Sequence, residues 1–344
     1  MTRKGMKRRN FLHQAIQFPL IGPFVKTMIA PSEASANKFS GILAEPLADP
    51  NFVPARTIPV YRPAPETWSK SELTVAWIGH STVLINFYGI ILLTDPVLFD
   101  RVGLHLFGAT FGISRLSPPA LPFAAIPKPD VVLLSHAHMD HCDIQSLKSL
   151  TEKYPGQIAA IIAKNTRDVI EELAWKSVQE LDWKEETSVV TDNGAIRIKG
   201  LEVRHFGWRL PGDLDRANGK RSGRSFNAYL LEREGKRIVF GGDTAMTDSF
   251  SKAFQHESLP VDIAIMPIGA YQPWKTVHCN PEEALQMARD MKALYFVPIH
   301  CQTFPLGRES TFEPLERLQS ALQLTDSPKL ALSAIGKTFV LPKA

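Results

Sequence analysis

The run His136-Ala137-His138-Met139-Asp140-His141 places four metal-ligating side chains within six residues, directly after the apolar stretch 131–134. Side chains two apart on an extended backbone point the same way, so His136 and His138 can bind one ion together. Asp140 and His141 follow where the chain turns towards a helix, and they can face a second ion. Because the chain has only ten histidines, chance crowding in a loop is a weak alternative. The run therefore predicts a two-metal hydrolase site at the end of a buried strand.

Three further potential ligands stand at the ends of predicted strands. His205 follows a strand at 201–204, Asp243 follows a strand at 237–240 through two glycines, and His300 follows a strand at 294–299. Glycine lets the backbone approach its neighbours closely. An α/β scaffold gathers strand-end loops on one edge, so these side chains can converge on the first cluster. Taken alone, each residue is equally well explained by a core or turn position.

The net charge is concentrated at the N-terminus. The chain has 344 residues, enough for one large domain, and a formal charge of +4. Six of the 39 basic residues but only one of the 35 acidic residues lie within residues 1–36, so the remainder carries a net charge of −1. This nearly neutral body gives no electrostatic argument for nucleic-acid binding.

Residues 1–36 have the features of an export signal. The run Lys7-Arg8-Arg9-Asn10-Phe11-Leu12 resembles the twin-arginine signature, a moderately apolar stretch follows at 15–30, and Ala34-Ser35-Ala36 offers a cleavage site. Two prolines, a glycine and a lysine interrupt the stretch, which makes it a poor transmembrane helix. A basic tail is the alternative. We expect a signal peptide at 1–36 and a periplasmic or extracytoplasmic protein that is exported folded.

The rest of the chain is predicted to be a proline-rich extended arm at 37–72 and an α/β domain at 73–344. Asn280, Pro281 and Glu283 predict a helix start with a capping box. Other helices are expected at 144–153 and 314–324. Strands are expected at 73–78, 82–87, 90–93, 131–134, 158–163, 195–198, 201–204, 226–232, 237–240, 261–266, 294–299 and 331–340.

Each of the three cysteines, Cys142, Cys279 and Cys301, directly follows a histidine. An odd count gives no disulfide framework. Neighbouring side chains usually point different ways, so we expect these thiols to be small buried groups beside the site rather than ligands. A disulfide between two of them in an oxidising compartment is the open alternative.

The order HxHxDH, His, Asp, His resembles the metallo-β-lactamase fold. Within that fold the chain resembles the branch of N-acylphosphatidylethanolamine-hydrolysing phospholipase D and the ascorbate-6-phosphate lactonases, and the phospholipase more closely. The resemblance covers roughly residues 70–340 and includes Trp77-Ile78-Gly79-His80-Ser81-Thr82, Leu93-Thr94-Asp95-Pro96, Glu180-Leu181-Asp182-Trp183, Gly242-Asp243-Thr244, Pro267-Ile268-Gly269-Ala270-Tyr271-Gln272-Pro273 and His278-Cys279-Asn280-Pro281-Glu282-Glu283-Ala284.

This resemblance implies a single-domain αββα sandwich of the α/β class, with two facing mixed β-sheets and helices outside. It implies one zinc at His136, His138 and His205, another at Asp140, His141 and His300, and Asp243 as the bridge. Ligands without thiolate suit Zn²⁺, and Fe or Mn are compatible with them. A hydroxide shared by the two metals would attack phosphorus or a lactone carbonyl, with Asp140 as a proton acceptor.

Five more residues are expected near the site: His80 and Asp95, as hydrogen-bond partners that fix ligand tautomers; His278, as a contact to the leaving group or phosphate; and Tyr271 and Gln272, as parts of the pocket wall. Core or turn roles are the alternatives for each. Arg115 and Arg209 are weaker candidates for phosphate binding.

Two segments depart from the phospholipase pattern. Residues 99–113 are apolar and glycine-rich, which favours a loop that covers a lipid substrate, touches a membrane at its periphery or packs on its own domain. Residues 213–224 are polar and lack a tryptophan-rich pattern. The favoured function is hydrolysis of a phospholipid or related phosphodiester. A lactonase or other ester or amide hydrolase acting on a small molecule is the first alternative, and a non-catalytic metal-binding or stress-resistance protein is the second.

Overall fold

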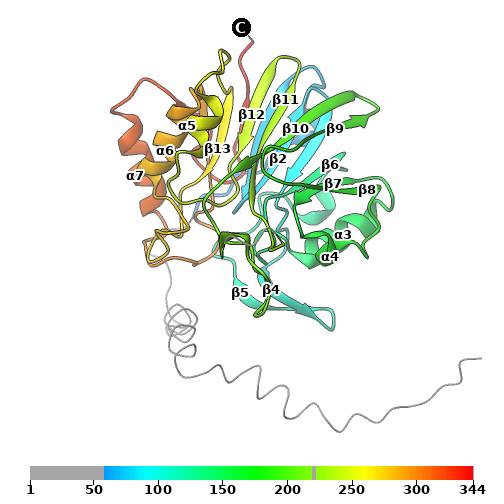
Figure 1. Cartoon of the computed structure of the whole chain (residues 1–344). Coiled ribbons are helices and arrows are strands. Elements are labelled where there is room, and N and C mark those ends of the chain that lie inside the picture. Colours follow the sequence, from blue (N-terminus) through cyan, green and yellow to red (C-terminus); the bar gives the residue numbers. More distant parts are fainter. Residues whose placement is uncertain (1–57, 219–221, 344) are drawn as a thin grey trace, which may run out of the picture. The chain divides into compact units, whose positions relative to one another are not determined.

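Buried apolar strands form the centre of the computed structural model, which describes residues 58–218 and 222–343 (Figure 1). The expected signal peptide and the arm as far as residue 57 lie outside the described residues. The rest of the arm follows the folded domain. Ile58 is buried, Tyr61 N donates to Ile335 O at 2.9 Å, and a short 3₁₀ helix spans Pro65–Thr67.

The first sheet has the strand order β16-β1-β2-β3-β6-β7-β8. Its strands are β1 (Leu73–Gly79), β2 (Thr82–Phe87), β3 (Ile90–Thr94), β6 (Val131–Leu134), β7 (Ala159–Ala163), β8 (Ser177–Leu181) and β16 (Thr338–Val340). Pairing is antiparallel from β16 to β3 and parallel from β3 to β8. Every residue of β1, β2, β6 and β7 is buried, as expected for central strands with continuous apolar runs.

The second sheet has the order β15-β14-β13-β12-β11-β10-β9. Its strands are β9 (Glu186–Thr191), β10 (Gly194–Glu202), β11 (Asn227–Arg233), β12 (Lys236–Phe240), β13 (Ile263–Pro267), β14 (Tyr295–Ile299) and β15 (Lys329–Leu330). Pairing is antiparallel from β9 to β12 and parallel from β12 to β15. Apolar side chains of both sheets form one large buried core.

Helices cover the outer faces, which completes the predicted αββα arrangement (Figure 1). They are α3 (Ile144–Lys153), α4 (Arg167–Ile170), α5 (Ser249–Phe254), α6 (Pro281–Asp290) and α7 (Glu313–Leu322), with further 3₁₀ turns at Phe123–Ala125 and Arg216–Asn218. The capping box predicted for α6 is confirmed, because Asn280 accepts from Glu283 N and Glu283 accepts from Asn280 N. Among the described helices, none combines the length and apolar character needed to cross a bilayer.

The structure corrects three sequence-based expectations. Residues 99–113 are not a loop but mainly a hairpin of β4 (Arg101–Leu106) and β5 (Ala109–Ser114), which pair with each other outside both large sheets. The single strand expected at 331–340 is wrong, because β15 and β16 join different sheets. The strands expected at 195–198 and 201–204 are one continuous strand, β10.

Candidate metal centre

The loops that follow β6, β10, β12 and β14 bring the predicted ligands together. His136, His138, Asp140 and His141 follow β6, His205 follows β10, Asp243 follows β12 and His300 follows β14. Close approach needs a glycine at one point: Gly242 has φ +56°, and a Cβ there would lie 2.6 Å from Ser135 Cβ. The structure thus brings all seven predicted ligand residues to one place, in groups whose ligand atoms lie within 4.8 Å of one another. Their role as ligands stays a prediction.

Three histidines form the first group. His136 Nε2 lies 2.7 Å from His138 Nδ1, and His205 Nε2 lies 3.2 Å from the same atom. Nitrogens at these separations can converge on a single cation.

The second group surrounds the two carboxylates. Asp140 Oδ2 lies 3.5 Å from His141 Nε2 and 3.6 Å from His300 Nε2. Asp243 Oδ2 lies 3.1 Å from each of these two nitrogens and 3.8 Å from His205 Nε2. Asp243 therefore lies between the two groups, where the sequence predicted a bridging carboxylate.

Backbone and side-chain acceptors fix the histidine tautomers. His205 Nδ1 lies 2.9 Å from Val277 O, and His141 Nδ1 lies 2.7 Å from Asp95 Oδ2. Because a carbonyl or carboxylate oxygen only accepts, both Nδ1 atoms carry a proton, which leaves Nε2 as the atom of each ring that can bind a metal. Such partners orient metal-binding histidines in proteins generally.

Ser135 fixes a third tautomer. Its hydroxyl donates to Asp95 Oδ2 at 2.6 Å, so its oxygen accepts from His136 Nδ1 at 2.8 Å. Its backbone N–H donates to Asp95 Oδ1 at 2.7 Å. Burial raises the pKa of Asp95, while the hydrogen bonds from His141 and Ser135 oppose that shift. Asp95 thus bonds to His141 directly and reaches His136 through Ser135, and its role as a support for metal ligands stays a prediction.

Several buried atoms in this cluster have no hydrogen-bond partner among the described residues, including His141 Nε2, His300 Nε2 and Asp243 Oδ1. An unsatisfied buried polar group costs about 1–3 kcal/mol. A divalent cation binds imidazole nitrogens and carboxylate oxygens of this kind and would satisfy these unpartnered atoms, so the residues fit a metal centre.

Charge within the cluster shifts the proton affinities in opposite directions. Burial, followed by repulsion from His205, lowers the pKa of His138 to about 3, and burial likewise holds the pKa of His136 well below its usual value. Burial would also lower the pKa of His300, but Asp243 and Asp140 outweigh it and raise that pKa to about 9. The first group therefore presents neutral imidazoles, whereas without a metal a proton occupies the second.

The family model of the β-lactamase superfamily domain matches residues 92–301. The chain belongs to this superfamily. Among its relatives, the N-acyl-phosphatidylethanolamine-hydrolyzing phospholipase D 1 of Caenorhabditis elegans is 31% identical over 283 residues, which cover 79% of this chain and 76% of that protein. An uncharacterised Mycobacterium tuberculosis protein is 32% identical over 280 residues, which cover 78% of this chain and 69% of that protein.

Solved structures of other superfamily members share the fold at lower identity. An isothiocyanate hydrolase from Delia radicum gut bacteria has a TM-score of 0.58 at 18% identity, covering 77% of this chain and 98% of that chain. A possible metal-dependent hydrolase from Veillonella parvula has a TM-score of 0.59 at 15% identity, covering 78% of this chain and 99% of that chain. The predicted metallo-β-lactamase fold is confirmed, and the chain is a metal-dependent hydrolase by family.

His80 was expected to fix the tautomer of a ligand, but it lies among the predicted ligands themselves. Its Nε2 lies 3.0 Å from Asp140 Oδ2, within the ligand-distance group of Asp140, His141 and His300. Its backbone is held in the left-handed region (φ +51°), with its N–H donating to Thr303 Oγ1 and its carbonyl accepting from Trp77 Nε1. Burial, then repulsion from His300, lowers the pKa of His80 to about 3, so the neutral ring donates to Asp140. Backbone strain of this kind persists where the surroundings enforce it.

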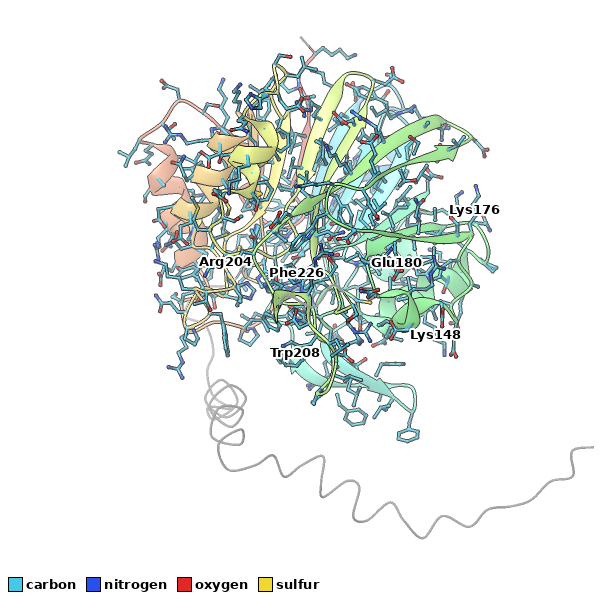
Figure 2. The ribbon with its side chains drawn as sticks, viewed as in Figure 1. Lys148, Lys176, Glu180, Arg204, Trp208 and Phe226 are labelled. Atoms are coloured by element: carbon cyan, nitrogen blue, oxygen red, sulfur yellow. The ribbon has the colours of Figure 1, made fainter. Side chains whose placement is uncertain are left out.

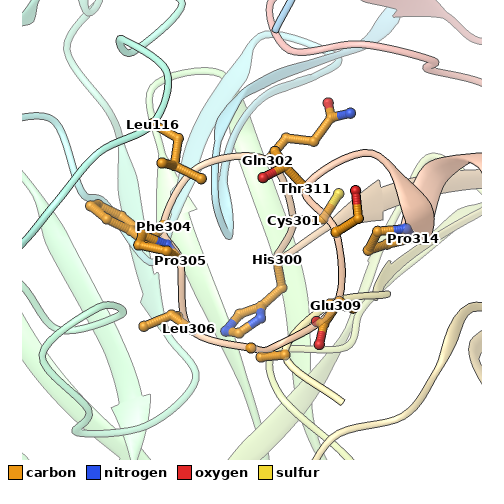
Figure 3. Close-up of a pocket in the computed structure, with 14 residues that line it drawn as sticks. Leu116, His300, Cys301, Gln302, Phe304, Pro305, Leu306, Glu309, Thr311 and Pro314 are labelled. Carbon is orange, nitrogen blue, oxygen red and sulfur yellow. The ribbon is translucent and has the colours of Figure 1, made fainter. Parts of the chain in front are cut away.

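Of the other predicted site residues, His278 lies beside the predicted ligands, whereas Tyr271 and Gln272 do not. His278 is buried, and its Nδ1 lies 3.8 Å from Asp243 Oδ2. Tyr271 points to the helix layer instead, where its hydroxyl donates to Glu313 at 2.8 Å, and Gln272 is exposed. Figure 3 shows a small pocket beside His300, enclosed by the loop that follows β14, and neither Tyr271 nor Gln272 lines it. A pocket role for these two residues stays a prediction.

The three cysteines are free and buried, and none belongs to a ligand-distance group of the described residues. Burial raises the pKa of Cys142 to about 11 and raises that of Cys279 and Cys301 further. Protonated thiols are poor ligands, which fits the expected role of small buried groups.

Arg209 and Arg115, the weaker phosphate-binding candidates from the sequence, bond to backbone carbonyls in the structure. Arg209 Nη1 donates to Ala137 O at 2.7 Å and to Cys142 O at 2.9 Å. It therefore stabilises the loop 135–143, which carries four of the predicted ligands and is called the metal loop below, instead of presenting a free guanidinium to phosphate. Arg115 Nε likewise donates to Ser117 O. Ser135, which links Asp95 to His136, was not predicted as a site residue. Its position directly before His136 was the sequence signal that could have identified it.

Proposed function

We propose that the chain is a two-zinc phosphodiesterase of the N-acylphosphatidylethanolamine phospholipase D type, acting on a phospholipid or related diester. The observation that carries the proposal is the convergence of four overlapping ligand-distance groups around Asp140 and Asp243, with Nε2 of His141 and His205 left as the metal-binding atoms. The named activity of the Caenorhabditis elegans relative supports the choice of substrate.

The first ion would be held by His136, His138 and His205, and the second by Asp140, His141 and His300, with Asp243 between them. When bound, zinc supplies an acidified water and a Lewis acid for the phosphoryl oxygen. Iron or manganese is compatible with the same ligands.

The side chains around the ions would position the diester and move its protons. Asp140 accepts a hydrogen bond from His80 Nε2 through Oδ2, so its carboxylate is oriented while it accepts the proton of the attacking water. Burial holds the pKa of His278 well below its usual value, so its neutral ring donates one N–H. We assign that N–H to a phosphoryl or leaving-group oxygen. Water adds to phosphorus, the ester P–O bond breaks, and the leaving alcohol takes up a proton.

Metal analysis and a substrate panel test the proposal. Purified protein is loaded with zinc, its metal content is measured by mass spectrometry, and turnover of bis-p-nitrophenyl phosphate, N-acylphosphatidylethanolamine and a set of lactones is compared. We expect two ions per chain and diester hydrolysis that Asp140→Asn lowers by a hundredfold or more, about 2.7 kcal/mol in the barrier. Lactone turnover without diester turnover would support the ester hydrolase, and bound metal with no turnover the non-catalytic protein.

We also propose that the chain is exported folded by the twin-arginine segment in residues 1–36. Replacing Arg8 and Arg9 by lysine keeps the charge and removes the paired guanidinium groups. Fractionation of cells expressing either form tests this: the full chain is expected in the periplasm, and the double variant in the cytoplasm. Equal retention of both forms in the cytoplasm would refute export.

A further inference from the structure

Exposed apolar side chains concentrate in two segments beside the metal centre. Of the twelve large hydrophobic residues exposed in the described part of the chain, six belong to the β4–β5 hairpin or to the loop after His205. They are Leu104, Leu106, Phe107 and Phe111 of the hairpin and Leu210 and Leu214 of the loop. Phe107, at the hairpin turn, is fully exposed. Isolated exposed hydrophobics are common, whereas a cluster indicates an interaction surface.

One segment is attached to the loop that carries the predicted ligands, and the other to helix α3, which directly follows that loop. Thr110 Oγ1 of the hairpin donates to Gln145 Oε1 of α3 at 2.8 Å. Arg209 Nη1 of the second segment donates to Ala137 O and Cys142 O. In Figure 2, Trp208 lies at the lower end of the molecule, on the side of the β4–β5 hairpin. The two apolar segments therefore flank the metal loop.

An aromatic path leads from this surface into the site. The ring of Phe206 lies 4.3 Å from the ring of His138, and the ring of Trp208 lies 5.5 Å from that of Phe206. Both aromatic residues are only partly buried. A lipid held at the apolar surface thus has an apolar route to the ligand groups.

The hairpin is built to enter a lipid interface. Its strands pair across six residue positions, from Arg101 with Ser114 to Leu106 with Ala109, so the backbone groups between the two strands are satisfied, and those on the outer edges can face the polar headgroups. Gly103 and Gly112 pair so closely that a Cβ on either would lie 2.1 Å from the opposite carbonyl oxygen. Residues 101–114 include no carboxylate, and Arg101 is exposed. That charge pattern suits phospholipid phosphates.

We propose that the β4–β5 hairpin and the loop 208–214 form a docking surface for a phospholipid layer, with Phe107 entering between the headgroups. The inference rests on the proposed lipid substrate and adds the surface that meets it. A protruding turn of apolar side chains fits a fluid interface, whereas a protein partner or a second copy needs a broad complementary face.

Vesicle co-sedimentation of the zinc-loaded full chain tests the docking surface. Vesicles of phosphatidylcholine, with and without phosphatidylglycerol, are compared for wild type, the double variant Leu106→Ser/Phe107→Ser, and Leu324→Ser. Leu324 is the matched control, because it is 89% exposed and lies two residues past the end of α7, outside the two apolar segments. We expect each hairpin substitution to weaken binding about tenfold, the double variant roughly a hundredfold, and the control to match wild type.

Binding is scored without turnover, which separates the two proposals. Wild type that binds neither kind of vesicle, or a double variant that binds like wild type, overturns the docking surface even if diesters are hydrolysed. Vesicle binding without diester hydrolysis overturns the proposed function and leaves the docking surface in place. A wild-type dimer that the double variant dissociates, in size-exclusion chromatography, would assign the surface to a second copy and overturn the lipid proposal. Circular dichroism of each variant checks that it is folded.

Discussion

Asp95→Asn should weaken both metal sites without unfolding the protein. In the wild type, Asp95 accepts hydrogen bonds from Ser135 N, Ser135 Oγ and His141 Nδ1 at 2.6–2.7 Å. An Asn amide can replace one carboxylate oxygen as the acceptor from Ser135 N, but its NH₂ group must then face His141. The ring of His141 would have to accept through Nδ1 and carry its proton on Nε2. That proton blocks the lone pair that the metal needs.

The expected magnitude at each site follows from the change of histidine tautomer. Loss of a partner that orients a metal-binding histidine lowers metal affinity by about 10–100-fold, or roughly 1.4–2.7 kcal/mol. The backbone should tolerate the substitution, because Asp95 has φ +31° and Asn is among the residues that adopt the left-handed region. The first group should lose affinity as well, because the Asn NH₂ also faces Ser135 Oγ, which would then donate to His136 Nδ1 and move the proton of that ring to Nε2.

Titration of metal-free protein with zinc, in competition with a coloured chelator, measures the two affinities. Asp262→Asn is the control, because Asp262 is also a buried carboxylate that accepts from Arg237 N, but it precedes β13 at the end opposite the metal loops. The control should lose stability and keep both zinc affinities. Two wild-type zinc affinities in folded Asp95→Asn would refute the tautomer argument.

Three further results are expected. In metal-free protein the pKa of His300 is raised to about 9 from the ordinary 6.5, so its protonation stabilises the fold fully below pH 6.5, and this contribution is lost as the pH rises to about 9. The unfolding temperature of metal-free protein should therefore fall over this pH range, and an unfolding temperature that rises would contradict the argument. Bound zinc should remove the trend. Asn280→Ala should lower the free energy of unfolding by about 1 kcal/mol in urea titrations, while Asn280→Ser changes it little. Arg209→Ala should lower the free energy of unfolding by about 2 kcal/mol in the same titrations, because two carbonyls of the metal loop lose their charged donor. Arg209→Leu, which keeps most of the apolar stem, should lower it by a similar amount, because it lacks the same donor.

The local pattern of the sequence was enough to locate most of the fold. The helix expected at 144–153 coincides with α3, and the strand at 131–134 with β6, because apolar periodicity and helix-capping residues act within a few positions. The hairpin β4–β5 and the edge strands β8 and β9 were missed. The sequences of β4 and β5 do alternate apolar residues with polar residues or glycine, a signal that was available but not used. In all four strands most residues are exposed or half exposed, so pairing rather than burial holds them in strands.

The sequence by itself determined which side chains could bind metal, because ligand chemistry is a property of the residue and the HxHxDH spacing is local. Only the tertiary structure decided how these side chains are prepared. It brought Asp95 to both His141 and Ser135, Val277 O to His205, and His80 to Asp140. The residues in these contacts are 40 to 72 positions apart in the sequence. Those contacts depend on where strands end in space, and a loop's position in space is set by packing of the whole sandwich rather than by the residues of the loop.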